Sequence, residues 1–219
     1  MGAENEGIVR QVSAGGIAAS HLELKPVPIL VGPSVADEFN TVRSFLVPSA
    51  CFRREDNSFD FDSSFIFDFD AGPLKDLMIL HAGSKLSIFG HTDPVGQDDF
   101  NKVLSGRRAQ SVQGLLLRDV ALWEDLYRSH DTQGKDKWGV KSVQIMLNQV
   151  KFLTGRADGV LDEPTKDQLQ KFETARGLAP SGFDGKQEIS KLTFKQLATE
   201  YMDVICTDDD VKPFALTRE

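Results

Sequence analysis

Three polar side chains near the middle of the chain have the types and spacing of a small binding site. Asn101 and Arg108 lie seven residues apart, close to two helical turns, so one helix face would carry both. Asp93 precedes them. A carboxylate accepts hydrogen bonds from an ammonium group, and a guanidinium binds a carboxylate through two parallel bonds. The trio therefore suits a ligand with both groups, such as a free amino-acid end. The alternative is a plain salt bridge between Asp93 and Arg108.

A strand, a polar turn and a helix are needed to bring these side chains together. Residues 85–89 alternate polar and apolar types, which predicts a half-buried strand. Residues 90–96 have the composition of a turn, and Asp98 or Asp99 can cap a helix that runs to about Arg118. The turn would fold the carboxylate back toward the helix face that carries the amide and the guanidinium.

A longer motif surrounds the trio. It consists of Gly90, His91, Thr92, Asp93, Pro94, Val95 and Gly96, followed by Asn101, Leu104, Ser105, Arg107, Arg108, Ala109 and Val112. This motif resembles the OmpA C-terminal-like family, which includes peptidoglycan-associated lipoproteins and flagellar stator proteins. Members of that family bind the diaminopimelate of the peptidoglycan stem peptide non-covalently. The resemblance implies that Asp93 and Arg108 are the main ligands of diaminopimelate and that Asn101 supports them, with Thr92 and Leu104 in the same site.

Two similar strings, residues 59–62 and 67–70, compete for the first strand of such a domain. The OmpA-like pattern needs a helix of about 10–15 residues between this strand and the motif. A start at residue 59 leaves room for that helix, with its core over residues 73–82. The resemblance then implies a ligand-lining loop that consists of Asp60, Phe61, Asp62 and Ser63. The alternative for both strings is plain strand alternation, with core Phe and solvent-facing Asp.

Apolar residues at helical spacing after residue 138 predict three further helices. The apolar positions are Val140, Val143, Leu147 and Val150 in the first, Leu169, Phe172 and Ala175 in the second, and Leu192, Leu197 and Tyr201 in the third. Asp162 can cap the second helix, Pro164 fits its first turn, and Gly177 follows its end.

The same region carries a second motif, spread over residues 138–197. Its residues are Val143, Gln144, Leu147, Asp158, Gly159, Val160, Thr165, Phe172, Gly177, Leu178 and Gly182. The region resembles the small three-helix peptidoglycan-binding domain appended to wall hydrolases. Leu161 and Asp162 stand where that family has an aromatic residue and a Gly, and Glu173 stands where it has a Gln. These departures bear on ligand binding more than on fold. A helical adaptor that has lost wall binding is the alternative.

The sequence therefore predicts an α+β protein, an OmpA-like βαβαβ sandwich followed by a small three-helix bundle. The predicted units are an extended N-terminal arm (1–50), the OmpA-like domain (51–128), a linker (129–137), the helical domain (138–204) and a tail (205–219). Within the arm, three prolines favour an extended stretch over residues 22–33, and residues 36–46 suit a short helix. Cys51 and Cys206 either form a disulfide in an oxidising compartment or remain unpaired thiols.

Composition excludes several classes of function. The chain has 219 residues and a formal net charge of −8, which argues against nucleic-acid binding. No apolar run reaches the roughly 18 residues that span a bilayer. The first seven residues are acidic and lack the apolar core of an export signal. We therefore expect either a trimmed sequence or another export route, and the acidic tail leaves room for a longer native protein.

Catalytic and metal-binding patterns are absent from the sequence. The four histidines, His21, His81, His91 and His130, are too far apart for a metal-binding pair. There is no nucleophile elbow, and Cys51 has no nearby basic partner. The sequence predicts no enzyme activity, no cofactor and no metal.

These observations lead to one functional hypothesis with two rivals. The chain is expected to bind the peptidoglycan stem peptide in the bacterial cell envelope, in the periplasm, and to anchor or target a larger envelope or injection assembly. A secretion or phage-tail-like injection apparatus is then a second partner to consider. The rivals are the wall-targeting portion of a larger peptidoglycan hydrolase and a structural adaptor without wall binding.

Overall fold

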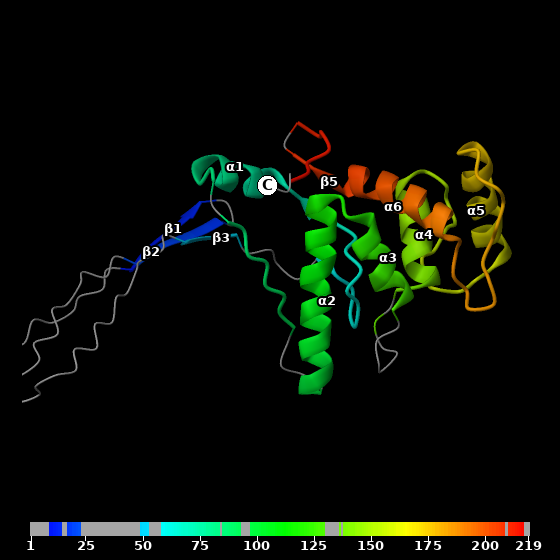
Figure 1. Ribbon diagram of the computed structural model, residues 1–219, viewed down its shortest axis with the longest axis horizontal. Helices are drawn as coiled ribbons and strands as arrows, with labels where there is room; N and C mark the ends of the chain where they lie inside the picture. Colours follow the sequence, from blue (N-terminus) through cyan, green and yellow to red (C-terminus); the bar gives the residue numbers. More distant parts are fainter. Residues whose placement is uncertain are drawn as a thin grey trace, which may run out of the picture.

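The computed structural model describes residues 9–14, 17–22, 49–52, 58–83, 85–92, 97–129, 136, 138–208 and 210–216, with only the backbone for the first three strands. In that part of the chain, helices dominate and the sheets are small (Figure 1). No helix among the described residues is long and apolar enough to cross a membrane.

A three-stranded antiparallel sheet forms near the N-terminus. It consists of β1 (Val9–Ala14), β2 (Ile17–Leu22) and β3 (Ser49–Phe52), in the order β1-β2-β3. The sequence predicted only an extended arm here, so this sheet was missed. The helix expected over residues 36–46 lies outside the described residues, as does most of the extended stretch over residues 22–33.

The segment from residue 58 to residue 70 differs from the predicted strand. Phe59 forms one antiparallel bridge with Ile66, and the chain turns between them, with Asp62 at a φ of 52°. The strand, β4 (Phe69–Asp70), falls in the second Phe-Asp string, so the choice of residues 59–62 was wrong. A short loop that returns on itself buries Phe65 and Ile66, which a solvated alternating strand would not do.

Helix α1 (Gly72–Leu80) follows β4 directly, close to the predicted helix core, with Pro73 in its first turn. It lies against β3 (Figure 1). Strand β4 pairs in parallel with β5 (Cys206–Thr207), so the middle of the chain and its end share a two-stranded sheet.

Residues 85–89 do not form the predicted strand, because no strand lies alongside them in the described part of the chain. They lead instead to a close backbone crossing on α2 (Asp98–Leu117). A Cβ at Gly90 would lie 1.9 Å from the carbonyl oxygen of Ser105, so only Gly fits. The predicted βαβαβ sandwich is therefore not seen among the described residues.

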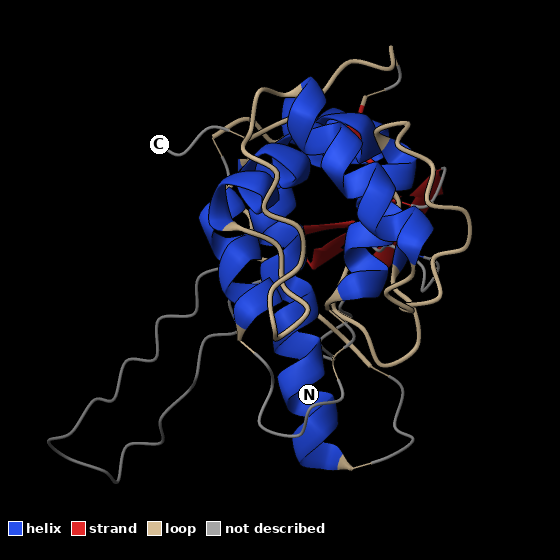
Figure 2. Cartoon of the chain, turned by 90° about the vertical axis from the view of Figure 1, so that its right-hand side faces the viewer, coloured by secondary structure: helices blue, strands red, loops and turns tan. Residues whose placement is uncertain are grey.

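Helix α2 matches the predicted helix in extent, and its N-terminal half projects beyond the other helices (Figures 1 and 2). Its N-cap is Gln97 without a side-chain cap; Asp98 and Asp99 lie in the first turn instead. Two acidic side chains in the first turn stabilise the helix, because they interact favourably with the positive end of the helix dipole. Arg118 ends the helix with a φ of 53°.

Four helices follow α2 among the residues that the structure describes, and the last three confirm the pattern expected after residue 138. Helix α3 (Val120–Arg128) is followed by α4 (Val140–Gln149), α5 (Glu163–Ala175) and α6 (Lys191–Ile205). Asp162 caps α5 as predicted, because its side chain accepts a hydrogen bond from the Thr165 amide at 2.9 Å. Gly177 follows α5 with a φ of 66°, the left-handed region that favours glycine.

One hydrophobic core runs through both halves of the described chain. Phe65, Trp123, Trp138 and Tyr201 form an aromatic cluster in which Phe65 and Trp138 have ring centroids 5.0 Å apart. The Tyr201 hydroxyl donates to the carbonyl of Ile66 at 3.0 Å. The predicted core positions of the helical region are buried, except that Ala175 and Leu192 are exposed and Val150 is partly buried.

The described tail folds back on this core. The Phe214 amide donates to the carbonyl of Cys206 at 2.8 Å, and the Leu216 amide donates to that of Leu116 at 2.7 Å. Cys206 is a free, buried thiol, which is the unpaired alternative left open by the sequence. Burial raises the pKa of the Cys206 thiol to about 11, so the thiol stays protonated and unreactive at neutral pH.

Candidate functional site

Arg108 joins three segments that are distant in the sequence. From the middle of α2, its Nε donates to the carbonyl of Ser63 at 2.9 Å and one terminal nitrogen donates to the carbonyl of Asp60 at 3.2 Å. The other terminal nitrogen lies 3.5 Å from the carbonyl of His91. The guanidinium also lies 5.1 Å from the ring centroid of Phe59. The Arg108 guanidinium is thus held between the loop over residues 60–64, called here the 60–64 loop, and residue 91 of the motif.

The 60–64 loop is itself tightly organised. The Ser63 amide donates to the carbonyl of Asp60 at 3.2 Å, and the Ser63 hydroxyl accepts from the Phe65 amide at 3.1 Å. Ser63 is buried, whereas Phe61 is 72% exposed at the turn. The loop that was predicted to line the ligand site is therefore next to Arg108, and its backbone is a turn and not a strand. Its contact with a ligand stays a prediction.

The other predicted ligands lie on both sides of this arginine. Thr92 is half-buried, one residue after the carbonyl that faces Arg108. Asn101 lies two turns before Arg108 on α2, and Leu104 lies one turn before it and is buried. Asp93, the predicted acidic ligand, lies outside the described residues. Its pairing with Arg108 therefore stays a prediction.

A buried polar network beside the site was missed by sequence reasoning. Arg107 binds Asp136 through Nε and the carbonyl of Leu126 at 2.7 Å. Asp136, whose side chain is 2% exposed, accepts from both the amide and the hydroxyl of Ser64. The Trp138 indole donates to the same hydroxyl at 2.7 Å. Arg107 was visible in the motif, but Asp136 lies in a polar stretch with no helical or strand pattern, so nothing local indicated their contact.

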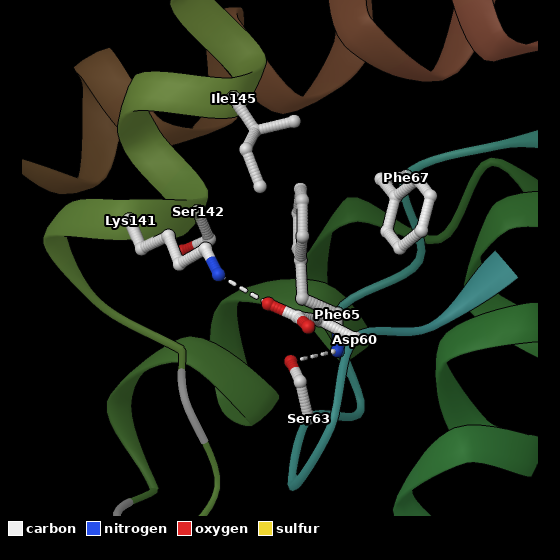
Figure 3. A pocket seen from close by; sticks show the side chains of 7 residues that line it. All are labelled: Asp60, Ser63, Phe65, Phe67, Lys141, Ser142 and Ile145. Carbon is white, nitrogen blue, oxygen red and sulfur yellow. Dashed lines mark hydrogen bonds and ion pairs between the residues drawn. The ribbon is translucent and has the colours of Figure 1, made fainter. Parts of the chain in front are cut away.

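A small pocket lies under the 60–64 loop, at its seam with α4 (Figure 3). The loop side contributes Asp60, Ser63, Phe65 and Phe67, and α4 contributes Lys141, Ser142 and Ile145. The Lys141 ammonium binds the Asp60 carboxylate across the seam. Asp60 thus has two roles, with its carbonyl facing Arg108 and its side chain facing α4.

The residues that carry the second motif hold the helical region together. Gln144 is buried; its amide nitrogen donates to the carbonyl of Val160 and to Thr165, both at 3.0 Å, and its oxygen accepts from the Gly159 amide at 2.8 Å. Glu173 is fully buried too, despite its charge. It accepts from Ser181, Gly182 and Thr193. These hydrogen bonds give Gln144 and Glu173 a structural role in the helical region.

No group of three or more His, Cys, Asp or Glu side chains that could hold a metal occurs among the described residues. The site chemistry is that of hydrogen-bond donors and opposite charges. The Arg108 guanidinium can bind an anionic group, whereas the seam pocket is a separate feature that Arg108 does not line.

Comparison with known proteins supports one part of this arrangement directly. Residues 139–192 match a protein family described as "Putative peptidoglycan binding domain". The match covers α4, α5 and the start of α6, and it confirms the resemblance seen in the sequence of the helical region. Peptidoglycan binding is therefore the general function that the chain's sequence supports.

A second match is more limited. Outer membrane porin F of Pseudomonas fluorescens is 37% identical over 67 residues, which cover 29% of this chain and 21% of that protein. The chain thus spans about a fifth of that relative's length, and the OmpA-like resemblance of the first part stays a prediction. No solved structure matches the chain at a significant level.

Proposed function

We propose that this chain binds bacterial peptidoglycan non-covalently through a diaminopimelate-type stem peptide held between Asp93 and Arg108. The observation that carries the proposal is the placement of Arg108, whose guanidinium lies against the 60–64 loop and the carbonyl of His91. Asp93 follows His91 by two residues. Because the His91 carbonyl faces the guanidinium, this short separation supports the proposal that one ligand with an ammonium and a carboxylate binds both Asp93 and Arg108.

The helical region supplies the second wall contact in this proposal. It matches a peptidoglycan-binding family over residues 139–192. The aromatic cluster and the Asp136 network pack it against the first part, which supports a fixed spacing between the two proposed contacts. Two contacts on one polymer raise the overall affinity by effective concentration when both can engage at once.

We further propose that the chain is not an enzyme and acts in the cell envelope, in the periplasm, as an anchor or targeting element of a larger envelope or injection assembly. The match to an outer membrane porin and the match to a peptidoglycan-binding family support the envelope location. The rival is the wall-targeting portion of a larger hydrolase. Release of soluble muropeptides from sacculi by the native full-length protein would favour that rival.

Cosedimentation with purified diaminopimelate-type sacculi tests the central proposal. The wild type is compared with Asp93→Ala and Arg108→Ala, and Asp99→Ala and Lys102→Ala serve as controls because both are exposed charges on α2. A hydrogen bond to a charged group contributes about 1.5–3 kcal/mol, so each site variant should bind about tenfold or more weakly.

The outcomes separate the hypotheses. Loss of binding in both site variants, with both controls unchanged, supports the stem-peptide site. Equal pelleting of every variant would mean that the helical region or a nonspecific surface carries the binding. If the wild type stays in solution, wall anchoring is wrong and the adaptor hypothesis stands.

A further inference from the structure

The 60–64 loop is held from two helices that belong to different parts of the chain. From α2, Arg108 binds the carbonyls of Asp60 and Ser63. From α4, Lys141 binds the Asp60 side chain. Asp60 is therefore the residue at which the helical region and the proposed ligand site meet.

Other contacts join the same loop to residues beyond α3. Ser64 donates from its amide to Asp136 at 2.9 Å and accepts from the Trp138 indole at 2.7 Å. The neighbouring Ile66 carbonyl accepts from Tyr201 of α6 at 3.0 Å. The position of the loop therefore depends on contacts with the helical region as well as on contacts with α2.

The seam pocket shows how closely the loop and α4 fit. The rings of Phe65 and Phe67 and the side chain of Ile145 give it an apolar lining, with the Asp60–Lys141 pair beside them (Figure 3). A shift of the loop away from α4 would separate the ion pair, and a shift in either direction would change this packing.

We infer that Lys141 is a positioning residue for the stem-peptide site, through which α4 sets the conformation of the 60–64 loop and hence the orientation of Arg108. The helical region then has a second role besides its own wall contact, because it completes the first site. The part of this inference that concerns affinity rests on the proposed function. The part that concerns Arg108 does not, since it can be measured without a ligand.

The Lys141–Asp60 ion pair is the contact that can be broken to test the positioning role without disturbing the folded core. Asp136 and Trp138 are buried, so their substitution disturbs the core. The Lys141 side chain is 33% exposed and that of Asp60 is 42% exposed, so the pair can be broken without opening the interior. Lys141→Met keeps most of the side-chain length and removes the charge. Lys141→Arg keeps the charge, and Lys171→Met breaks a comparable exposed pair with Asp167 on α5.

The first measurement is the side-chain Nε–H resonance of Arg108 in the full chain without ligand, recorded by NMR and assigned by its loss in Arg108→Lys. We expect it to shift or broaden in Lys141→Met and to return in Lys141→Arg, with no change in Lys171→Met. The second is the dissociation constant of a soluble diaminopimelate muropeptide. An exposed ion pair contributes little, so the constant should rise about two- to fivefold in Lys141→Met, and less in high salt.

Each result decides something. An Arg108 resonance that is unchanged in Lys141→Met overturns the inference, whatever the muropeptide does. A muropeptide that binds all four proteins equally overturns the part that concerns affinity, because binding would then not depend on the Lys141–Asp60 pair. A shifted resonance in a protein that binds no muropeptide supports the positioning of Arg108 by Lys141 and contradicts the proposed function instead.

Discussion

Arg107 and Arg108 are consecutive in the chain, yet they hold the 60–64 loop by separate routes. Arg108 binds the backbone carbonyls of Asp60 and Ser63 directly. Arg107 reaches the loop through Asp136, which accepts two hydrogen bonds from Ser64. One arginine therefore faces the proposed ligand site, and the other belongs to the buried network that supports it.

This division predicts that substitution of Arg107 chiefly lowers stability and that substitution of Arg108 chiefly lowers ligand affinity. Arg107→Ala should lower the free energy of unfolding by about 3 kcal/mol, because it leaves the buried Asp136 carboxylate with its Ser64 bonds but without its cation. Arg108→Ala should chiefly weaken muropeptide binding. Urea unfolding and a binding titration on both variants separate the effects, with Lys102→Ala as the control. Equal loss of stability in both arginine variants would contradict the division.

Gly90 lies at the close backbone crossing on α2, and Gly106, within that helix, offers a control position without close contacts. A Cβ at Gly90 would overlap the Ser105 carbonyl, whereas a Cβ at Gly106 meets nothing within 4 Å. Gly90→Ala should push the His91 carbonyl away from Arg108 and weaken muropeptide binding, with some loss of stability. Gly106→Ala should stabilise the helix by up to about 1 kcal/mol and leave binding unchanged. Thermal unfolding and titration of both variants test this; unchanged binding in Gly90→Ala would refute the role of the crossing.

Glu173 should be better suited to this fold than the Gln usual in the family that the helical region resembles. Its carboxylate faces donors from Ser181, Gly182 and Thr193 and is fully buried. Glu173→Gln places an amide nitrogen against at least one donor, so we expect a loss of about 2 kcal/mol in urea unfolding. Glu163→Gln, at an 86% exposed side chain, should change stability by less than about 0.5 kcal/mol. A neutral Glu173→Gln would show that the cluster rearranges.

Stability should fall in acid partly through Glu200. The hydrogen bonds from Arg176, at 2.5 and 2.7 Å, hold the pKa of the Glu200 carboxyl below its ordinary value near 4.5. A lowered pKa in the folded state gives stability that is present above about pH 4.5 and is lost as the pH falls through the folded value.

Glu200→Gln removes this contribution and gives a direct check. The variant should be less stable than the wild type at pH 7, by up to about 1 kcal/mol, and the two should converge in strong acid. Urea unfolding over a range of pH measures the difference, and Asp167→Asn controls for the loss of an exposed carboxylate. A difference that stays constant with pH would assign the effect to packing.

The sequence by itself determined most of the helices after residue 97. Helical spacing of Val143 and Leu147, the cap at Asp162 and the stop at Gly177 are local signals, and the structure confirms them. The family match over residues 139–192 agrees with the motif read from the same region. Capping, turn conformation and amphipathic periodicity depend on residues a few positions apart, so a sequence can report them without its fold.

Only the tertiary structure decided where the strands lie and how the site is built. The strings at residues 59–62 and 67–70 are nearly identical in pattern, but only Phe69 and Asp70 have a partner strand, at Cys206 and Thr207. The contacts of Asp60 with Lys141 and of Asp136 with Ser64 span 81 and 72 residues. A strand requires a neighbour, and an ion pair or hydrogen bond between distant residues requires a partner in space; neither is specified by residues nearby in the chain.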